Sequence, residues 1–204
     1  MAERISVDID VKRITRQLKL IGVDARKGLS GGLHDAAFQL RSLWIADINR
    51  FIDNPKPFTK KVFVKKSNPD NLISTTFLPP IQSEYLKNVI EGGLRRPGDI
   101  GTLSATILIP VNARLTKAGN FPRGSAVRWL ATVEEKIKGA FVGSTGGEEG
   151  RTAVYQSFKS GKIKLLAVFE RTIQYDRQLP LEKTTEQFAG RADDILQRSL
   201  DRVL

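Results

Sequence analysis

The sequence predicts an α+β fold, in which an antiparallel sheet packs against a long N-terminal helix and a C-terminal helix. Two apolar stripes with helical spacing lead to this prediction, one through residues 24–52 and one through 179–204. Between them, short segments rich in β-branched and aromatic residues are separated by Gly, Pro and Asn, which is typical of strands and turns. Long helices around a run of strands favour α+β over alternating β/α order.

The chain begins with a predicted strand. Residues 5–11 alternate apolar and polar side chains, which places the apolar ones on one face of a half-buried strand. A short helix is expected next, with Ile14, Leu18 and Ile21 at helical spacing and Gly22 at its end.

The clearest predicted element is a long amphipathic helix from about Asp24 to Ile52. Ser30, Gly31 and Gly32 interrupt its stripe, and each glycine costs up to about 1 kcal/mol in a helix interior. We therefore expect a kink or break there. A single helix cannot bury its own stripe, so this one must lie across a sheet or another helix. The stripe consists of Leu29, Leu33, Ala36, Ala37, Leu40, Leu43, Trp44, Ile48 and Phe51.

The middle of the chain predicts a hairpin and a set of further strands. Asn54–Pro57 ends the long helix, because proline cannot continue it. Residues 58–66 and 72–78 read as two strands joined by the turn at 67–71. The later elements are a helix at 81–90, a Gly/Arg-rich loop at 92–105, strands at 106–111, 140–143, 153–158 and 162–172, an exposed polar segment at 112–124, and helices at 126–137 and 179–204. We expect one domain over residues 1–204, with an inserted loop-rich region around 92–125.

Composition excludes several classes of protein. The 204 residues include no cysteine, which rules out disulfides and cysteine-ligated zinc. No apolar run approaches the roughly 20 residues that cross a bilayer, so no membrane partner is expected, and the first residues show no signal-peptide pattern. We expect a protein made and used in the cytosol. Its net charge of +11 indicates contact with an anionic partner or with acidic proteins.

Few residues point to catalysis or to a cofactor. His34 is the only histidine, and its neighbour Asp35 projects about 100° away on a helix, so the two form no ready dyad. The Gly-rich loop at 143–150 lacks the Gly-Lys-Ser/Thr ending of a phosphate-binding loop. The sequence therefore predicts no enzyme, no metal and no cofactor. Adjacent carboxylates occur at Glu134-Glu135, Glu148-Glu149 and Asp193-Asp194.

Six basic residues are candidates for a DNA-channel or partner-facing surface. Lys60, Lys61, Lys65 and Lys66 bracket one predicted strand, and Arg95 and Arg96 lie in a glycine-containing loop. Such side chains suit phosphate contacts without base readout. Lysine near strand ends also protects edge strands from unwanted pairing, so this alternative stays open.

Several short motifs resemble a family of phage tail-completion proteins. Residues 5–51, with Arg26–Ser30 and Asp35–Phe38, resemble the opening of the minor tail protein Z-like and related neck families. Residues 54–62 are similar to a "PTPFT-basic" stretch of that family. Gln82–Lys87 and Ile90–Gly93, followed by Arg95 and Arg96, are similar to its "YL…EGG" segment. The resemblance covers residues 5–96 and, by position, the closing helix, and residues 100–178 match no family pattern.

The resemblance implies a structural virion protein without catalytic residues, located in the tail or neck. Such proteins form a ring, commonly a hexamer, that joins a tail terminator or tail tube protein to a head-tail adaptor or connector protein. Genomic DNA passes through the lumen without sequence specificity. The alternatives are a monomeric non-specific nucleic-acid-binding protein, a Mg²⁺ nuclease using clustered carboxylates such as Glu148 and Glu149, or another virion part such as a tail terminator or head-tail adaptor.

Overall fold

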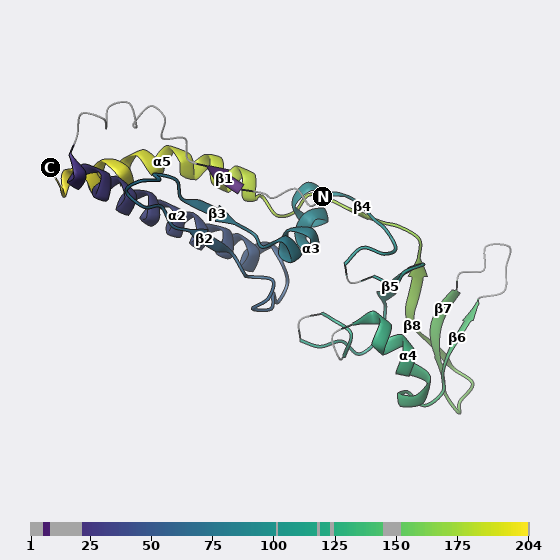
Figure 1. Ribbon diagram of the computed structural model, residues 1–204. Coiled ribbons are helices and arrows are strands. Elements are labelled where there is room, and N and C mark those ends of the chain that lie inside the picture. Colours follow the sequence, from purple (N-terminus) through teal and green to yellow (C-terminus); the bar gives the residue numbers. More distant parts are fainter. Residues whose placement is uncertain are drawn as a thin grey trace. The chain divides into compact units, whose positions relative to one another are not determined.

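The computed structural model describes residues 6–8, 22–100, 102–117, 119–122, 125–144 and 152–203, with the backbone alone for residues 6–8. Helices and antiparallel sheets form an α+β fold, as the sequence predicts (Figure 1). The chain divides into two compact units. Residues 1–90 and 178–204 form the terminal unit, and residues 91–177 form the inserted unit, which is longer than the insertion expected at 92–125. The predicted helix through residues 14–21 lies outside the described residues.

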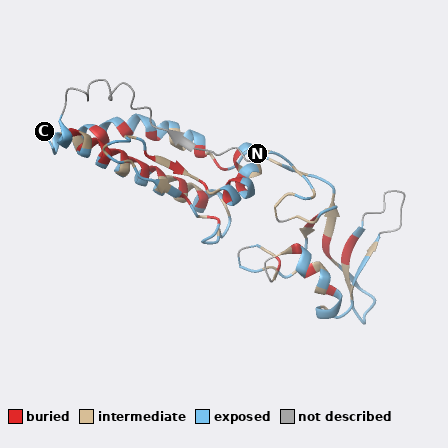
Figure 2. Ribbon diagram, in the orientation of Figure 1, coloured by how far each residue is buried: buried red, intermediate tan, exposed pale blue. Residues whose placement is uncertain are grey.

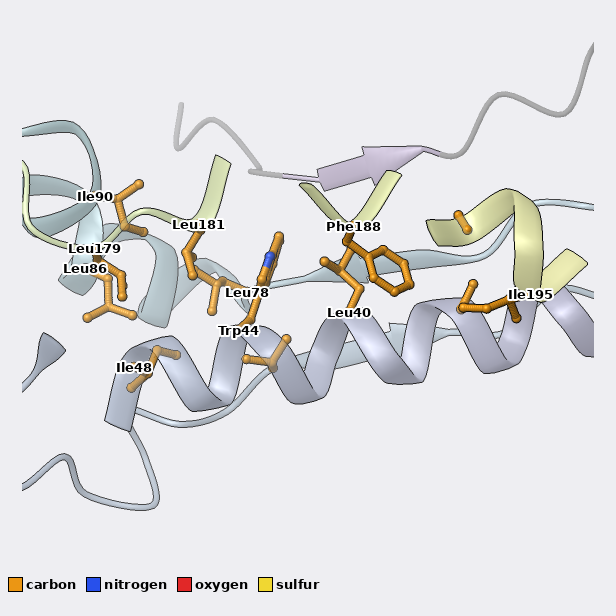
Figure 3. Packing of buried hydrophobic residues seen from close by; sticks show 13 residues of the cluster. Leu40, Trp44, Ile48, Leu78, Leu86, Ile90, Leu179, Leu181, Phe188 and Ile195 are labelled. Atoms are coloured by element: carbon orange, nitrogen blue, oxygen red, sulfur yellow. The ribbon is translucent and has the colours of Figure 1, made fainter. Parts of the chain in front are cut away.

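Two long helices, α2 (Val23–Phe51) and α5 (Leu181–Asp201), pack side by side in the terminal unit (Figure 1). Most of the apolar stripe of α2 is buried as predicted, although Leu43 is half-buried and Phe51 is exposed, and the buried residues follow the facing sides of the two helices (Figure 2). Figure 3 shows Leu40 and Trp44 of α2 beside Phe188 of α5. A fully buried large apolar side chain stabilises a fold by about 1.5–3 kcal/mol. The cluster consists of Ala36, Leu40, Trp44, Ile48, Val62, Leu78, Leu86, Ile90, Leu179, Leu181, Phe188, Ala192 and Ile195.

The predicted break of the long helix at its glycines is wrong, because α2 runs without interruption from Val23 to Phe51. Its glycines instead allow close contact with α5. A Cβ atom on Gly32 would lie 2.8 Å from the Cβ of Ser199, and one on Gly28 would overlap the side chain of Val203. The Ser199 hydroxyl donates a hydrogen bond of 2.6 Å to the carbonyl of Gly28. This contact between helices offsets the low helix propensity of glycine.

A small antiparallel sheet packs against α2. Its strand order is β1 (Ser6–Asp8), β3 (Thr75–Phe77) and β2 (Phe63–Lys65), so the predicted N-terminal strand and hairpin are both present, and the two hairpin strands are shorter than predicted. The buried hydroxyl of Thr76 donates a hydrogen bond of 2.9 Å to the carbonyl of Ala37 in α2. This bond satisfies a polar group that would otherwise be costly to bury.

Helix α3 (Pro80–Glu91) follows β3 and contributes Leu86 and Ile90 to the core. The carbonyl of Val89, near its end, accepts hydrogen bonds of 2.9 Å from the backbone N–H groups of both Gln178 and Leu179. The last residues before the inserted unit are therefore joined to the first residues after it.

The inserted unit contains two antiparallel sheets. Strands β5 (Ile107–Pro110), β8 (Ile163–Glu170), β7 (Thr152–Ser157) and β6 (Ala140–Ser144) form the larger one in that order. Strands β4 (Gly93–Arg95) and β9 (Ile173–Tyr175) form the smaller one. The prediction of a loop throughout 92–105 is therefore wrong at β4, and the predicted strand at 162–172 corresponds to β8.

One helix, α4 (Ala126–Lys136), covers a separate core in the inserted unit. The Ser125 hydroxyl caps it by accepting a hydrogen bond of 3.1 Å from the N–H of Arg128. The ring of Trp129 packs against that of Phe121 in a tilted arrangement, with ring centroids 4.6 Å apart. Phe121 is buried, so the prediction that residues 112–124 are exposed throughout is wrong at this position. The buried members of this core are Leu108, Phe121, Ala126, Trp129, Val133, Val154, Leu166 and Ala167.

Candidate polyanion-binding surface

The candidate catalytic side chains do not converge in the described part of the chain. His34 is half-buried and stacks on Phe38, with ring centroids 4.7 Å apart, while Asp35 is exposed. Glu134 accepts a hydrogen bond of 3.3 Å from the backbone N–H of Val142, and Glu148 and Glu149 lie outside the described residues. Among the described residues, no three His, Asp or Glu side chains are grouped closely enough to hold a metal ion.

An open depression of about 470 Å³ lies on the surface of α2 and α5. Its polar groups are those of ordinary helix surfaces, and Arg191 is its only cationic side chain. The Ser42 hydroxyl donates a hydrogen bond of 2.9 Å to the carbonyl of Phe38 in its own helix rather than to a base, so the depression has the character of a surface hollow. The lining residues are Asp35, Phe38, Gln39, Ser42, Leu43, Phe188 and Arg191.

The lysines around β2 lie on a defined face of the terminal unit. Val62 and Thr76 are buried against α2, and side chains alternate between the two faces of a strand. Lys61, Phe63 and Lys65 therefore project from the opposite face of the sheet. We call this side, with Phe77 of β3, the outer face.

The outer face combines aromatic and cationic side chains. Phe63 is 50% exposed, and its ring centroid lies 6.0 Å from that of Phe77 on the neighbouring strand. The Lys61 ammonium lies 5.8 Å from the ring centroid of Phe58, which is within the range of a cation–π contact. Exposed aromatic rings beside lysines provide both stacking area and positive charge for an anionic partner.

The remaining two lysines extend this positive surface. Lys60 is half-buried in the turn before β2, and Lys66 is exposed just after the strand. Within the described residues, none of the lysines at positions 60, 61, 65 and 66 forms an ion pair. Strand β2 is also outermost in its sheet, so these charges discourage pairing with a further strand as well.

The two arginines have different surroundings. Arg95 is half-buried in β4, and its guanidinium donates hydrogen bonds of 3.3 Å to the Tyr175 hydroxyl and 2.6 Å to the carbonyl of Ile100. Its role is therefore to hold the loop after β4. Arg96 is exposed, and its backbone N–H donates to the Asp99 carboxylate at 2.8 Å. The six candidates are thus divided between the two units, and Arg95 is engaged within its own unit.

A second group of lysines, which is not among the six sequence-based candidates, lies in the inserted unit. Lys138, Lys159, Lys162 and Lys164 are all exposed at one end of the larger sheet of the inserted unit. The sequence contains a signal for a basic surface here, because three lysines and no acidic residue occur in Phe158-Lys159-Ser160-Gly161-Lys162-Ile163-Lys164.

Comparison of the chain with protein-family models, with curated protein sequences and with solved structures found no match. No helix in the described part of the chain is both long and apolar enough to cross a lipid bilayer. Functional inference therefore depends on the residues of the chain and on the geometry of its two units.

Proposed function

We propose that this chain is a structural protein of a tailed bacteriophage virion and forms a ring at the head–tail junction. The observation that carries the proposal is that the residues with the family resemblance nearly coincide with the residues of the terminal unit. The motifs that resemble tail-completion proteins lie in residues 5–96, and the closing helix matches by position. The terminal unit consists of residues 1–90 and 178–204, so nearly all of that resemblance falls in one compact unit.

The surface of the terminal unit supports a role in assembly. Several large apolar side chains remain exposed there, and such side chains provide contacts for neighbouring subunits. They lie both on α2 and around the small sheet, so they face more than one direction of approach. These residues include Phe38, Phe51, Phe58, Phe63, Ile73 and Ile81.

The expected partners follow from the proposed position in the particle. Copies of this chain form the ring, with six as the commonest number in the resembled family. The ring joins a tail terminator or tail tube protein to a head-tail adaptor or connector protein. DNA passes through its lumen, and the lysines of the outer face, which form no ion pair with a described residue, are directed toward DNA or an acidic partner, where their contacts carry no sequence preference.

The test is the composition of particles together with the mass of the purified chain. Mass spectrometry of purified virions is expected to detect this chain at a fixed stoichiometry, and light scattering is expected to show an oligomer in solution or on addition of a neighbouring virion protein. Particles that join heads to tails and infect normally without this chain would overturn the proposal.

The exposed lysines of the outer face also favour a second candidate, a monomeric protein that binds nucleic acid without sequence preference. A salt titration of DNA binding, combined with mass measurement, separates the two functions. A steep loss of affinity with salt by a protein that stays monomeric with every virion partner supports the second candidate.

A further inference from the structure

The second lysine group lies at the end of the larger sheet where β7 turns into β8. The hairpin is closed by two backbone hydrogen bonds of 2.9 Å, from Phe158 to Lys162 and from Gly161 to Phe158. Gly161 has a φ of 76°, which glycine adopts without strain. The lysines beside this turn are therefore presented by an ordered two-stranded ribbon.

The turn between α4 and β6 adds Lys138 to the same end. The side-chain amide of Gln156 donates a hydrogen bond of 3.2 Å to the carbonyl of Lys138. Gln156 in turn pairs with Lys164 in the register of β7 and β8. Residues 138 and 164 are thus brought to one sheet end although they lie far apart in the sequence.

Acidic residues are absent from this end within the described residues of the three strands. Strands β6 and β7 contain no Asp or Glu, and Glu170 of β8 lies at the opposite end of that strand from Ile163. On α4, Glu134 is turned toward the backbone of Val142, in the middle of β6. The exposed Glu135 of α4 lies three residues before Lys138, but among the described residues no acidic side chain forms an ion pair with the lysines at positions 138, 159, 162 and 164.

We propose that this lysine-rich sheet end binds the phosphate backbone of duplex DNA, with the β7–β8 turn placed at a groove. A two-stranded β-ribbon fits the major groove, and lysines on the ribbon and beside it then reach phosphates on both strands. Phe158 and Ile163 are exposed at the turn and supply apolar contact with sugars. The turn itself presents only Phe158 as an aromatic ring, because the stacked pair of Phe141 and Tyr155 lies back along β6 and β7, and this favours a duplex over a single strand as ligand. Duplex binding by this sheet end does not require the proposed virion role, because it depends only on the residues of this surface.

The test compares three triple variants of the full chain for binding to a fluorescent duplex of mixed sequence across a salt series. In the first, Lys159, Lys162 and Lys164 become Gln. In the second, the same residues become Arg. In the third, Arg114, Lys117 and Arg171 become Gln, which removes an equal charge from exposed positions elsewhere in the inserted unit. Circular dichroism and thermal melting confirm that each variant is folded.

The first variant is expected to bind at least about tenfold more weakly, and its slope of log affinity against log salt is expected to fall by about 2.7, for three lost phosphate contacts. The Arg variant and the distant Gln variant are expected to stay close to the parent. An unchanged slope in the first variant overturns the proposal, and so does an equal loss in the distant one. Vesicles of phosphatidylglycerol and phosphatidylcholine provide the last comparison. If the chain binds these vesicles through the same lysines and does not bind the duplex, the proposal is also overturned.

Discussion

The terminal and inserted units each bury an apolar core, but they build it by different routes. The terminal unit depends on contacts between the two ends of the chain, such as the hydrogen bond from Ser199 to Gly28. The inserted unit is built mainly from consecutive antiparallel strands, β6 to β7 to β8, and one short helix. Contacts close in sequence form faster, because less loop entropy is lost before they form. We therefore expect the inserted unit to fold first and the terminal unit to require the complete chain.

The chain's two tryptophans allow the units to be followed separately, since Trp44 lies in one and Trp129 in the other. The largest expected effect is that of Trp44→Ala. Trp44 is fully buried, and its indole N–H donates a hydrogen bond of 3.1 Å to the Thr185 hydroxyl. Its loss should destabilise the terminal unit by about 3–5 kcal/mol.

Denaturant unfolding of this variant, monitored by the remaining Trp129, should leave the transition of the inserted unit nearly unchanged. The converse variant, Trp129→Phe, reports the terminal unit through Trp44. Coincident transitions from both probes in every variant would show that the two units unfold as one.

The next effect concerns Gly139→Ala in the turn between α4 and β6. Gly139 has a φ of 79°, and a Cβ there would overlap the carbonyl oxygen of Ser157. The left-handed conformation costs about 1–2 kcal/mol, and relieving the overlap costs about 1–3 kcal/mol more. The loss should appear as a shift of the Trp129 unfolding transition to a lower denaturant concentration.

Gly161→Ala is the matched control, because Gly161 has a φ of 76° with open space around it, so only the conformational cost applies. Equal losses in both variants would contradict the role given to the Ser157 contact.

Alanine substitutions at two neighbouring glycines should change stability in opposite directions, and this tests the packing of α2 on α5. Gly32→Ala places a methyl group 2.8 Å from the Cβ of Ser199 and should destabilise the terminal unit by about 1–3 kcal/mol. Gly31→Ala meets only the Ser199 hydroxyl at 3.8 Å, so it should stabilise the helix by up to about 1 kcal/mol. Thermal melting of the two variants measures both. Stabilisation by both alanines would mean that α5 approaches α2 less closely than described.

The smallest effect on stability is expected at the outer face. Replacement of Lys61 and Lys65 by Gln should change the free energy of unfolding by less than about 0.5 kcal/mol, because both are exposed and form no ion pair with a described residue. The same variant should bind duplex DNA or an acidic virion partner more weakly, as measured by anisotropy. Undiminished binding to both would leave edge protection as the role of these lysines.

The sequence was most informative where one long pattern decides the structure. The apolar stripe of α2 and the turn at 67–71 were predicted because periodicity and turn chemistry are local. The uninterrupted course of α2 through Gly31 and Gly32 was not, because its reason lies in α5, far along the chain. Strand β4 was missed since Gly93-Leu94-Arg95 has no strand pattern and depends on pairing with β9.

The candidate surface shows the same difference between features that are local in the sequence and features that depend on distant residues. The lysines that bracket β2 were found because they are close in sequence, and their common face follows from strand alternation. The structural role of Arg95 depends on Tyr175 and Ile100, which the sequence does not bring near it. The lysine-rich sheet end combines residues 138 and 158–164, and only the strand register places them together.

The carbonyl of Val89 accepts hydrogen bonds from the backbone N–H groups of both Gln178 and Leu179. The polypeptide leaves the terminal unit and returns to it at adjoining points. Loop closure costs only about 0.6 kcal/mol more for each doubling of length. The terminal unit should therefore tolerate a shorter or longer segment between these points at little cost in stability, as long as the bonds at Val89 are kept.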